Sequence, residues 1–187
     1  MNAIGRVIEP ATVQAYHEDE IRSLVLDEFR GRWLILLFYP GDFTFVCPTE
    51  FAEMARLYPE FVKLDAQVCG VSTDSVYVHK AWHDSSPMVR SVEFPLIADV
   101  TGTLSRQFGV YLEEEGIARR GTFVIDPDGV LRAYEVHDNS IGRDMRETLR
   151  KLQAAIRVRE GEGEACPAGW QPGRPTLTPG LDLVGKL

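Results

Sequence analysis

An uninterrupted apolar run from Trp33 to Tyr39 constrains the fold of this chain more than any other feature. A continuous apolar run of this kind is typical of a strand buried on both faces of a sheet. The run stops at Pro40, and a helix is predicted to open at Cys47 with Pro48 in its first turn. One thiol is therefore expected at the carboxyl edge of a buried strand and at the start of a helix.

That position has consequences for the chemistry of Cys47. Unpaired backbone N–H groups and the positive end of the helix dipole favour a thiolate over a thiol there. A thiolate is a nucleophile, so Cys47 is the candidate reactive residue. The alternative is a small buried cysteine that only fills space in the core.

Length and charge narrow the class of protein. With 187 residues and 44% hydrophobic content, the chain is long enough for one domain with a full core. Its formal charge of -8 and the lack of a dominant basic patch argue against a nucleic-acid partner. We see no leader-like apolar segment and no apolar run that approaches the roughly 18 residues of a membrane span. The expectation is a soluble cytoplasmic protein with no membrane segment.

Periodicity predicts strands alternating with helices, and hence a mixed α/β sandwich. Further strands are expected over 12–16, 67–71, 95–98, 122–125 and 131–136. Helices are expected over 50–64 (kinked at Pro59), 76–84, 104–108 and 141–156. Asp126-Pro127-Asp128-Gly129 is a hairpin signal, whereas 18–29 fits either a helix or a second strand. Gly and Pro recur after residue 156, which predicts a domain over 1–157 and an extended tail over 158–187.

The other cysteines and a pair of histidines are further candidate ligands or reactive groups. Cys69 lies in the middle of the predicted strand 67–71 and is expected to be buried and inert, whereas Cys166 lies in the Gly-rich tail with little packing reason to be there. The lack of a C-x-x-C pair argues against a thioredoxin-type dithiol site. The three cysteines are too dispersed for zinc, and His79 and His83 are expected to be solvated helix residues, so no metal is predicted.

Two separated motifs carry a resemblance to a known family. Pro40, Thr44 and Cys47 stand at the spacing P-x-x-x-T-x-x-C of the peroxiredoxins, and F-T-F-V-C-P-T-E is the form typical of their two-cysteine branch. The segment 164–170 around Cys166 resembles the one that carries the resolving cysteine of that branch. The tail 181–187 resembles the end of the peroxidase subunit of bacterial alkyl hydroperoxide reductases.

The resemblance implies a thioredoxin-like fold and a thiol peroxidase that reduces hydrogen peroxide and alkyl hydroperoxides. Cys47 would become a sulfenic acid, and Cys166 of the partner subunit would resolve it as a disulfide. The functional unit would be a homodimer, commonly assembled as a ring of five dimers. No cofactor is expected, because no nucleotide-binding fingerprint is present. Electrons would come from a flavoprotein disulfide reductase or a thioredoxin-like reductant.

The resemblance also assigns the residues around Cys47. Arg120, directly before the strand 121–125, matches the arginine that points at the thiolate, with neighbouring Arg119 as the competing candidate, since alternation sends only one inward. Thr44 would direct its hydroxyl toward the sulfur and a peroxide oxygen, unless it is an ordinary β-branched loop residue. Pro40 would shape and shield the pocket.

Two further charged residues are expected to support the site. Glu50, at the start of the helix, would orient the arginine through a carboxylate–guanidinium bond, and would also be favourable there simply as a negative charge at a helix N-terminus. Arg143 matches a second arginine of the family and is expected behind the first.

Competing functions are a thioredoxin-type disulfide oxidoreductase, which the absent C-x-x-C opposes, and a holdase chaperone in which Cys47 is vestigial. Peroxide-sensitive relatives carry a G-G-L-G insertion and a C-terminal Y-F extension. Here the corresponding region reads Glu113-Glu114-Glu115-Gly116-Ile117 and the sequence ends at Leu187. A peroxide-dependent regulatory switch is therefore not expected.

Overall fold

The computed structural model of the chain describes residues 3–186. The chain divides into two compact units, Met1–Met145 and Arg146–Leu187. The first contains the sheet and three α-helices, and the second contains helix α4 (Met145–Glu160) apart from its first residue, followed by the tail. The domain boundary expected after residue 157 stays a prediction.

The apolar run forms the central strand of the first unit. All six residues of β3 (Trp33–Phe38) are buried, as predicted. β3 lies parallel to β4 (Ala66–Ser72) and antiparallel to β8 (Arg120–Ile125). β5 (Leu96–Ala98) continues the parallel side, and β9 (Leu131–His137) pairs with β8 as the predicted hairpin.

The ambiguous segment 18–29 is a strand followed by one short helix. β1 (Thr12–His17) pairs with β2 (Glu20–Val25), and the 3-10 helix η1 (Leu26–Phe29) follows. Within residues 3–186, seven strands form one sheet in the order β2-β1-β5-β4-β3-β8-β9. The mixed α/β architecture predicted from the sequence is therefore confirmed.

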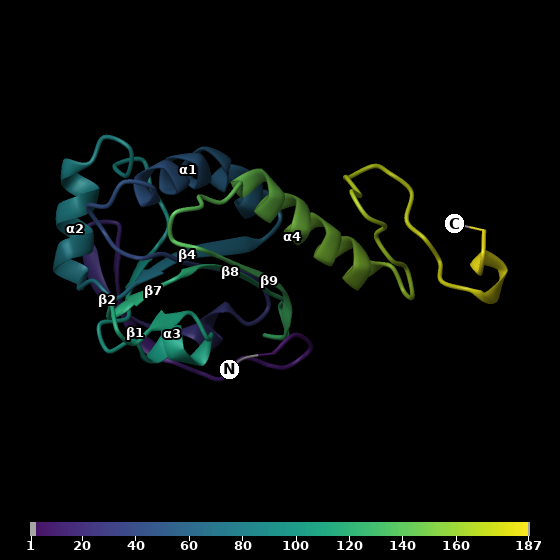
Figure 1. Ribbon diagram of the computed structural model, residues 1–187, viewed down its shortest axis with the longest axis horizontal. Coiled ribbons are helices and arrows are strands. Elements are labelled where there is room, and N and C mark those ends of the chain that lie inside the picture. The colour runs from purple at the N-terminus through teal and green to yellow at the C-terminus, as the bar shows by residue number, and fades with distance from the viewer. Residues whose placement is uncertain (1–2, 187) are drawn as a thin grey trace. The chain divides into compact units, whose positions relative to one another are not determined.

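Helices cover both faces of this sheet. α1 (Cys47–Lys63) and α3 (Thr103–Gln107) lie on opposite faces (Figure 1). α2 (Val76–Ser85) lies on the α1 side, where the ring of Trp82 packs against Tyr39 and Phe51. α1 remains one helix through Pro59.

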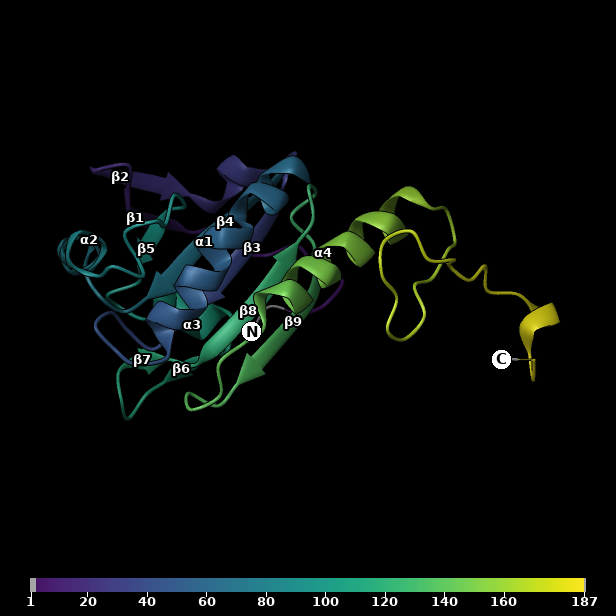
Figure 2. The ribbon, with the colours of Figure 1, turned by 90° about the horizontal axis from the view of Figure 1, so that it is seen from above.

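Residue alternation in the central strands divides the core between these two faces. Leu34, Leu36 and Phe38 of β3 belong to the cluster that also contains Leu104 of α3 and Phe108 beyond it. On the other face, α1 runs above β3 and β4 (Figure 2). Gly70 permits this close packing, because a Cβ there would lie 2.9 Å from the ring of Phe51.

Two features differ from the predicted element list. The short strands β6 (Tyr111–Leu112) and β7 (Ile117–Ala118) form a separate hairpin that was not predicted, and its turn contains the acidic run. α4 was expected over 141–156 but begins at Met145 and ends at Glu160.

After α4, the second unit is largely irregular, in keeping with the predicted extended tail. It contains an isolated bridge between Ala165 and Leu177 and the 3-10 helix η2 (Leu181–Leu183). Among the described residues, no helix is long and apolar enough to cross a membrane.

Candidate active site

Cys47 is the first residue of α1 and its side chain is inaccessible to solvent. Pro48 follows it in the first turn, and Val46, at the N-cap position, provides no side-chain cap to the helix. The sulfur therefore lies where the helix dipole favours negative charge.

Arg120 provides a cation beside that sulfur. Its Nη1 donates to Cys47 Sγ at 3.2 Å and to Glu50 Oε2 at 2.8 Å. Its Nε and Nη2 both donate to the backbone carbonyl of Asn139, at 3.0 and 2.8 Å. The guanidinium is thus held on two sides while one nitrogen points at the sulfur.

The strand register determines which of the two neighbouring arginines faces inward. Arg120 begins β8 and is 2% exposed, whereas Arg119 is exposed. Asn139 was not identified from the sequence. The hairpin offers a signal for it, since Arg120 pairs with His137 at the end of β9 and the residues just beyond must pass close to Arg120.

Glu50 joins Arg120 to a second arginine. Its Oε1 accepts from both the backbone N–H and Nε of Arg143, each at 2.9 Å, and its Oε2 accepts from Arg143 Nη2 at 2.8 Å. Burial alone would raise the pKa of Glu50, but the hydrogen bonds and charge of Arg143, together with the charge of Arg120, hold that pKa below its ordinary value.

The late start of α4 explains how Arg143 reaches Glu50. Because the helix begins at Met145, the backbone N–H of Arg143 is free of the helix and donates to the carboxylate. Arg143 Nη1 also donates to Gly121 O at 3.0 Å and to Thr122 Oγ1 at 3.2 Å. Arg143 is therefore bound to both α1 and β8.

Charge balance follows from these contacts. Cys47, Glu50, Arg120 and Arg143 form one buried group, with two guanidinium cations and one carboxylate. This group is neutral when Cys47 is a thiolate and carries a net positive charge when Cys47 is a thiol. A negative charge on the Cys47 sulfur would therefore be balanced within this buried group.

Thr44 and Pro40 lie in the loop between β3 and α1. The hydroxyl of Thr44 donates to Gly41 O at 2.8 Å, which leaves its oxygen lone pairs as acceptors. Both residues are partly buried. Their expected contacts with a peroxide stay predictions.

Cys166 belongs to the second unit. It is partly exposed, and its sulfur lies 3.8 Å from the carbonyl oxygen of Ala154 in α4. All three cysteines are within the described residues and are free thiols. The structure thus brings Cys47, Glu50, Arg120 and Arg143 together, and the pairing of Cys47 with Cys166 stays a prediction.

The expectation of solvated histidines on α2 is wrong for His79. Its side chain is fully buried and lies 2.8 Å from Asp42 Oδ2 through Nδ1. The helical spacing contains the signal that was missed, because Val76 and Trp82, three residues to either side, are also buried.

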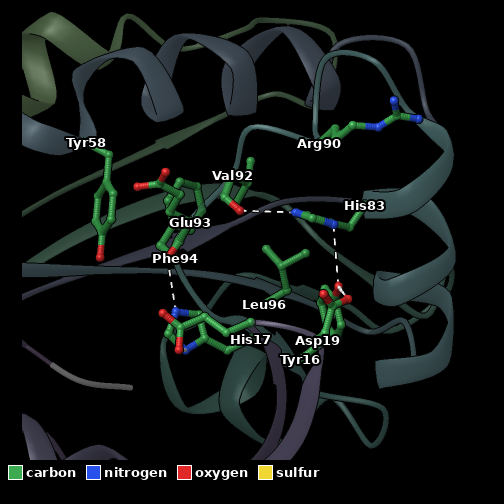
Figure 3. A pocket seen from close by; sticks show the side chains of 11 residues that line it. Tyr16, His17, Asp19, Tyr58, His83, Arg90, Val92, Glu93, Phe94 and Leu96 are labelled. Atoms are coloured by element: carbon green, nitrogen blue, oxygen red, sulfur yellow. Dashed lines mark hydrogen bonds and ion pairs between the residues drawn. The ribbon is translucent and has the colours of Figure 1, made fainter.

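His83, one turn later on α2, has different surroundings. It lines a cavity of about 490 Å³ between the β1–β2 turn and the segment after α2 (Figure 3). Its Nε2 lies 3.2 Å from Val92 O and its Nδ1 lies 3.4 Å from the hydroxyl of Tyr16. Within residues 3–186, no group of three His, Cys, Asp or Glu side chains is arranged to hold a metal ion.

Two segments of the chain match known protein families. Residues 4–134 match the AhpC/TSA family, and residues 155–183 match the C-terminal domain of 1-Cys peroxiredoxin. Alkyl hydroperoxide reductase C of Amphibacillus xylanus is 48% identical over 188 residues, and that of Pseudomonas aeruginosa is 46% identical over 187; each alignment covers 100% of both chains.

Solved structures agree with these relatives. The crystal structure of Enterococcus faecalis AhpC has a TM-score of 0.86 at 40% identity, and covers 89% of this chain and 100% of that one. Reduced 2-Cys peroxiredoxin from Plasmodium vivax has a TM-score of 0.86 at 30% identity, and the match covers 92% of this chain and 91% of that one. The expected thioredoxin-like fold is therefore confirmed. The chain belongs to the AhpC/TSA family and is a peroxiredoxin, a thiol-dependent peroxidase.

Proposed function

We propose that Cys47 is the peroxidatic cysteine and that it reduces hydrogen peroxide and alkyl hydroperoxides. The observation that carries this proposal is the buried group of Cys47, Glu50, Arg120 and Arg143, in which a guanidinium nitrogen lies 3.2 Å from the sulfur. Relatives named alkyl hydroperoxide reductase C support the alkyl hydroperoxide as a substrate class.

In the first step, the Cys47 thiolate attacks the terminal oxygen of the peroxide. A sulfur–oxygen bond forms, the oxygen–oxygen bond breaks, and the sulfur is oxidised to a sulfenic acid. The other peroxide oxygen leaves as alkoxide or hydroxide and takes a proton from water. Arg120 stabilises both the attacking thiolate and the leaving oxygen, and Thr44 supplies an acceptor for the peroxide O–H.

In the second step, the thiol of Cys166 from the partner subunit condenses with the sulfenic acid. A disulfide forms and water leaves. Because Cys47 is fully buried in the first turn of α1, this turn must open locally before another sulfur can reach it. The name of the Plasmodium vivax relative, a 2-Cys peroxiredoxin, supports a mechanism with two thiols.

The cycle closes when a protein dithiol reduces that disulfide by two electrons. We assign this role to a flavoprotein disulfide reductase or a thioredoxin-like protein, with no cofactor bound to this chain. The functional assembly in this proposal is a homodimer, further assembled as a ring of five dimers in the cytoplasm, where thiols are kept reduced.

The test uses the reduced full-length chain, with one equivalent of hydrogen peroxide or of an alkyl hydroperoxide. Sulfenic acid trapped with dimedone should map to Cys47, and a non-reducing gel should show a covalent dimer joined from Cys47 to Cys166 with Cys69 free. The Cys166→Ser variant should consume about one peroxide per chain and then stall as sulfenic acid or over-oxidise. Size-exclusion chromatography of the reduced chain should show the ring.

Different outcomes would refute different parts of the proposal. An intrachain disulfide, or one that includes Cys69, would refute resolution between subunits and leave the peroxidase intact. Peroxide loss that survives the alkylation of Cys47 would refute the assignment of the nucleophile. Disulfide exchange without peroxide loss would favour the oxidoreductase alternative, and protection of unfolded clients without either activity would favour the holdase.

A further inference from the structure

A second buried polar group lies beside the active-site loop. It consists of Tyr39, Asp42 and His79, which we call the loop clamp. The side chains of Asp42 and His79 are 0% exposed, and Tyr39 is 0% exposed as a residue. None of the three has a role in the chemistry proposed for Cys47.

The hydrogen bonds of the clamp determine how many protons it holds. His79 Nε2 lies 3.1 Å from the carbonyl oxygen of Ile97, which only accepts, so Nε2 carries a hydrogen. Tyr39 donates its hydroxyl hydrogen to Asp42 Oδ1 at 2.7 Å. His79 Nδ1 and Asp42 Oδ2, 2.8 Å apart, must then share one further proton.

Either location of that shared proton leaves the His79–Asp42 pair neutral overall, as a neutral pair or an ion pair. Burial raises the pKa of Asp42, and the hydrogen bond and charge of His79 act in the opposite direction. A buried pair of this kind contributes little net stability, so its value is expected to be positional.

Asp42 connects this pair to the loop that presents Cys47. The loop runs from Tyr39 to Val46, between β3 and α1. The backbone N–H of Asp42 donates to Asp74 Oδ2 at 2.8 Å, just beyond the end of β4. His79 belongs to α2 and bonds to β5, so the loop is held from several elements of the core.

The loop needs such support because its backbone is strained. Phe43, between Asp42 and Thr44, has φ of +54°, a left-handed conformation that is costly for a bulky side chain. Burial of the ring offsets little of this backbone cost, since Phe43 is 58% exposed. Strained residues persist where their surroundings over-determine them, and the anchored neighbour here is Asp42.

We propose that Asp42 and His79, with Tyr39, are positioning residues that hold the loop in the conformation required for peroxide attack by Cys47. This inference rests on the proposed function of Cys47. The clamp holds Gly41 and Thr44 in place, and thereby the hydroxyl that faces the peroxide. Loss of the clamp should slow attack without slowing the disulfide step, which requires this region to open.

The test compares four full-length variants with the parent chain. Asp42→Ala and His79→Ala break the clamp. Asp42→Asn preserves its hydrogen bonds, because the amide oxygen accepts from Tyr39 and the amide N–H donates to Nδ1 of a neutral His79. His83→Ala is the matched control, a histidine one turn away on the same helix that bonds outside the clamp (Figure 3).

Two rate constants are measured by stopped-flow fluorescence, one for peroxide attack and one for disulfide formation, together with urea unfolding. Asp42→Ala and His79→Ala should lower the attack rate constant by about a hundredfold, since small displacements near a reacting centre have effects of that size. Disulfide formation should be unchanged or faster. Asp42→Asn should recover most of the attack rate, and His83→Ala should preserve it.

Equal attack rates in the parent and in folded Asp42→Ala would overturn the proposal. The proposal would also be overturned if both rate constants fell in proportion to the loss of stability, and if His83→Ala showed the same losses. If both alanine variants fail to fold, His79→Gln replaces them. The single amide of glutamine can bond to Ile97 or to Asp42 but not to both, so this variant breaks one of the two bonds that His79 makes. Normal attack by folded His79→Gln would then overturn the clamp. Failure of the parent chain to consume peroxide would instead refute the function of Cys47.

Discussion

Cys47 and Cys69 are both fully buried cysteines of the first unit, yet their surroundings differ in every respect that matters for reactivity. Cys69 lies in the middle of β4 and belongs to the apolar cluster that includes Leu36 and Ile97. Cys47 lies at a helix N-terminus with a guanidinium nitrogen 3.2 Å from its sulfur.

Burial affects the two thiols differently because of those partners. Burial raises the pKa of Cys69 far above that of a free thiol, with only weak opposition from Arg22 and Arg32. At Cys47, the buried group of Glu50, Arg120 and Arg143 has a positive excess that a thiolate balances. The comparison teaches that a buried cysteine is reactive or inert according to the charges buried with it.

The largest effect is expected from serine substitution at Cys47, with the same substitution at Cys69 as its control. Cys47→Ser should abolish peroxide consumption, because a hydroxyl is not ionised at neutral pH and is a poor nucleophile. Cys69→Ser should retain the activity of the folded parent, since this sulfur lies among apolar side chains. Both are measured by peroxide loss with a thiol reductant present. Activity in folded Cys47→Ser, or loss of it in folded Cys69→Ser, would break the comparison.

The second prediction separates the contributions of Arg120. Arg120→Ala should slow peroxide attack by about a hundred- to a thousandfold, the usual effect of removing one donor that stabilises developing charge. Alkylation by iodoacetamide at fixed pH should slow by less, because it depends on the thiolate but forms no oxygen anion. Arg119→Ala is the control, since Arg119 is exposed. If Arg119→Ala gave the larger loss, the strand register of the site would be wrong.

The third prediction concerns stability and its dependence on pH. Glu50→Gln should lower the free energy of unfolding at pH 7 by about 3 kcal/mol, because Arg120 and Arg143 lose a buried counter-charge. The pKa of Glu50 is lowered in the folded state. Its stabilisation is therefore complete above the unfolded pKa of about 4.3 and is lost as the pH falls through the lower folded value.

Urea unfolding of the parent and Glu50→Gln across pH 3 to pH 7 measures that dependence. The difference between the two stability curves should narrow as the pH falls toward 3. Glu60→Gln is the control on the same helix, where an exposed bond to Lys63 is worth at most about 1 kcal/mol. A constant difference between parent and Glu50→Gln at every pH would mean that packing, rather than charge, makes Glu50 important.

The elements whose stability comes from local pattern were predictable. The apolar run predicts the position of β3, and the turn signal at Asp126–Gly129 predicts the β8–β9 hairpin. The β1–β2 hairpin was ambiguous because its turn residues, Glu18 and Asp19, have φ of 51° and 61°. Turns of this kind usually contain Asn or Gly, so the ordinary signal was missing.

Residues whose roles come from long-range contacts were harder to predict. α4 starts at Met145 rather than near Ile141, and the backbone N–H of Arg143 bonds to Glu50 on α1, which helical periodicity does not reveal. Asn139 acts through a backbone carbonyl, which leaves no signature in its residue type. The burial of His79 depends on Asp42 and Ile97, which are distant in sequence.

The smallest effect is expected at Cys69 itself. Cys69→Ala should lower the free energy of unfolding by about 1 kcal/mol, because a small cavity opens in the apolar cluster that contains Cys69. Cys69→Ser should cost more, since a hydroxyl would be buried in an apolar cluster. Urea unfolding measures both, and alkylation of Cys69 in the parent should occur only as the chain unfolds. Rapid alkylation of Cys69 in the folded chain would show that burial without a neighbouring cation does not make a thiol unreactive here. The difference in reactivity between Cys69 and Cys47 would then rest on Arg120 alone.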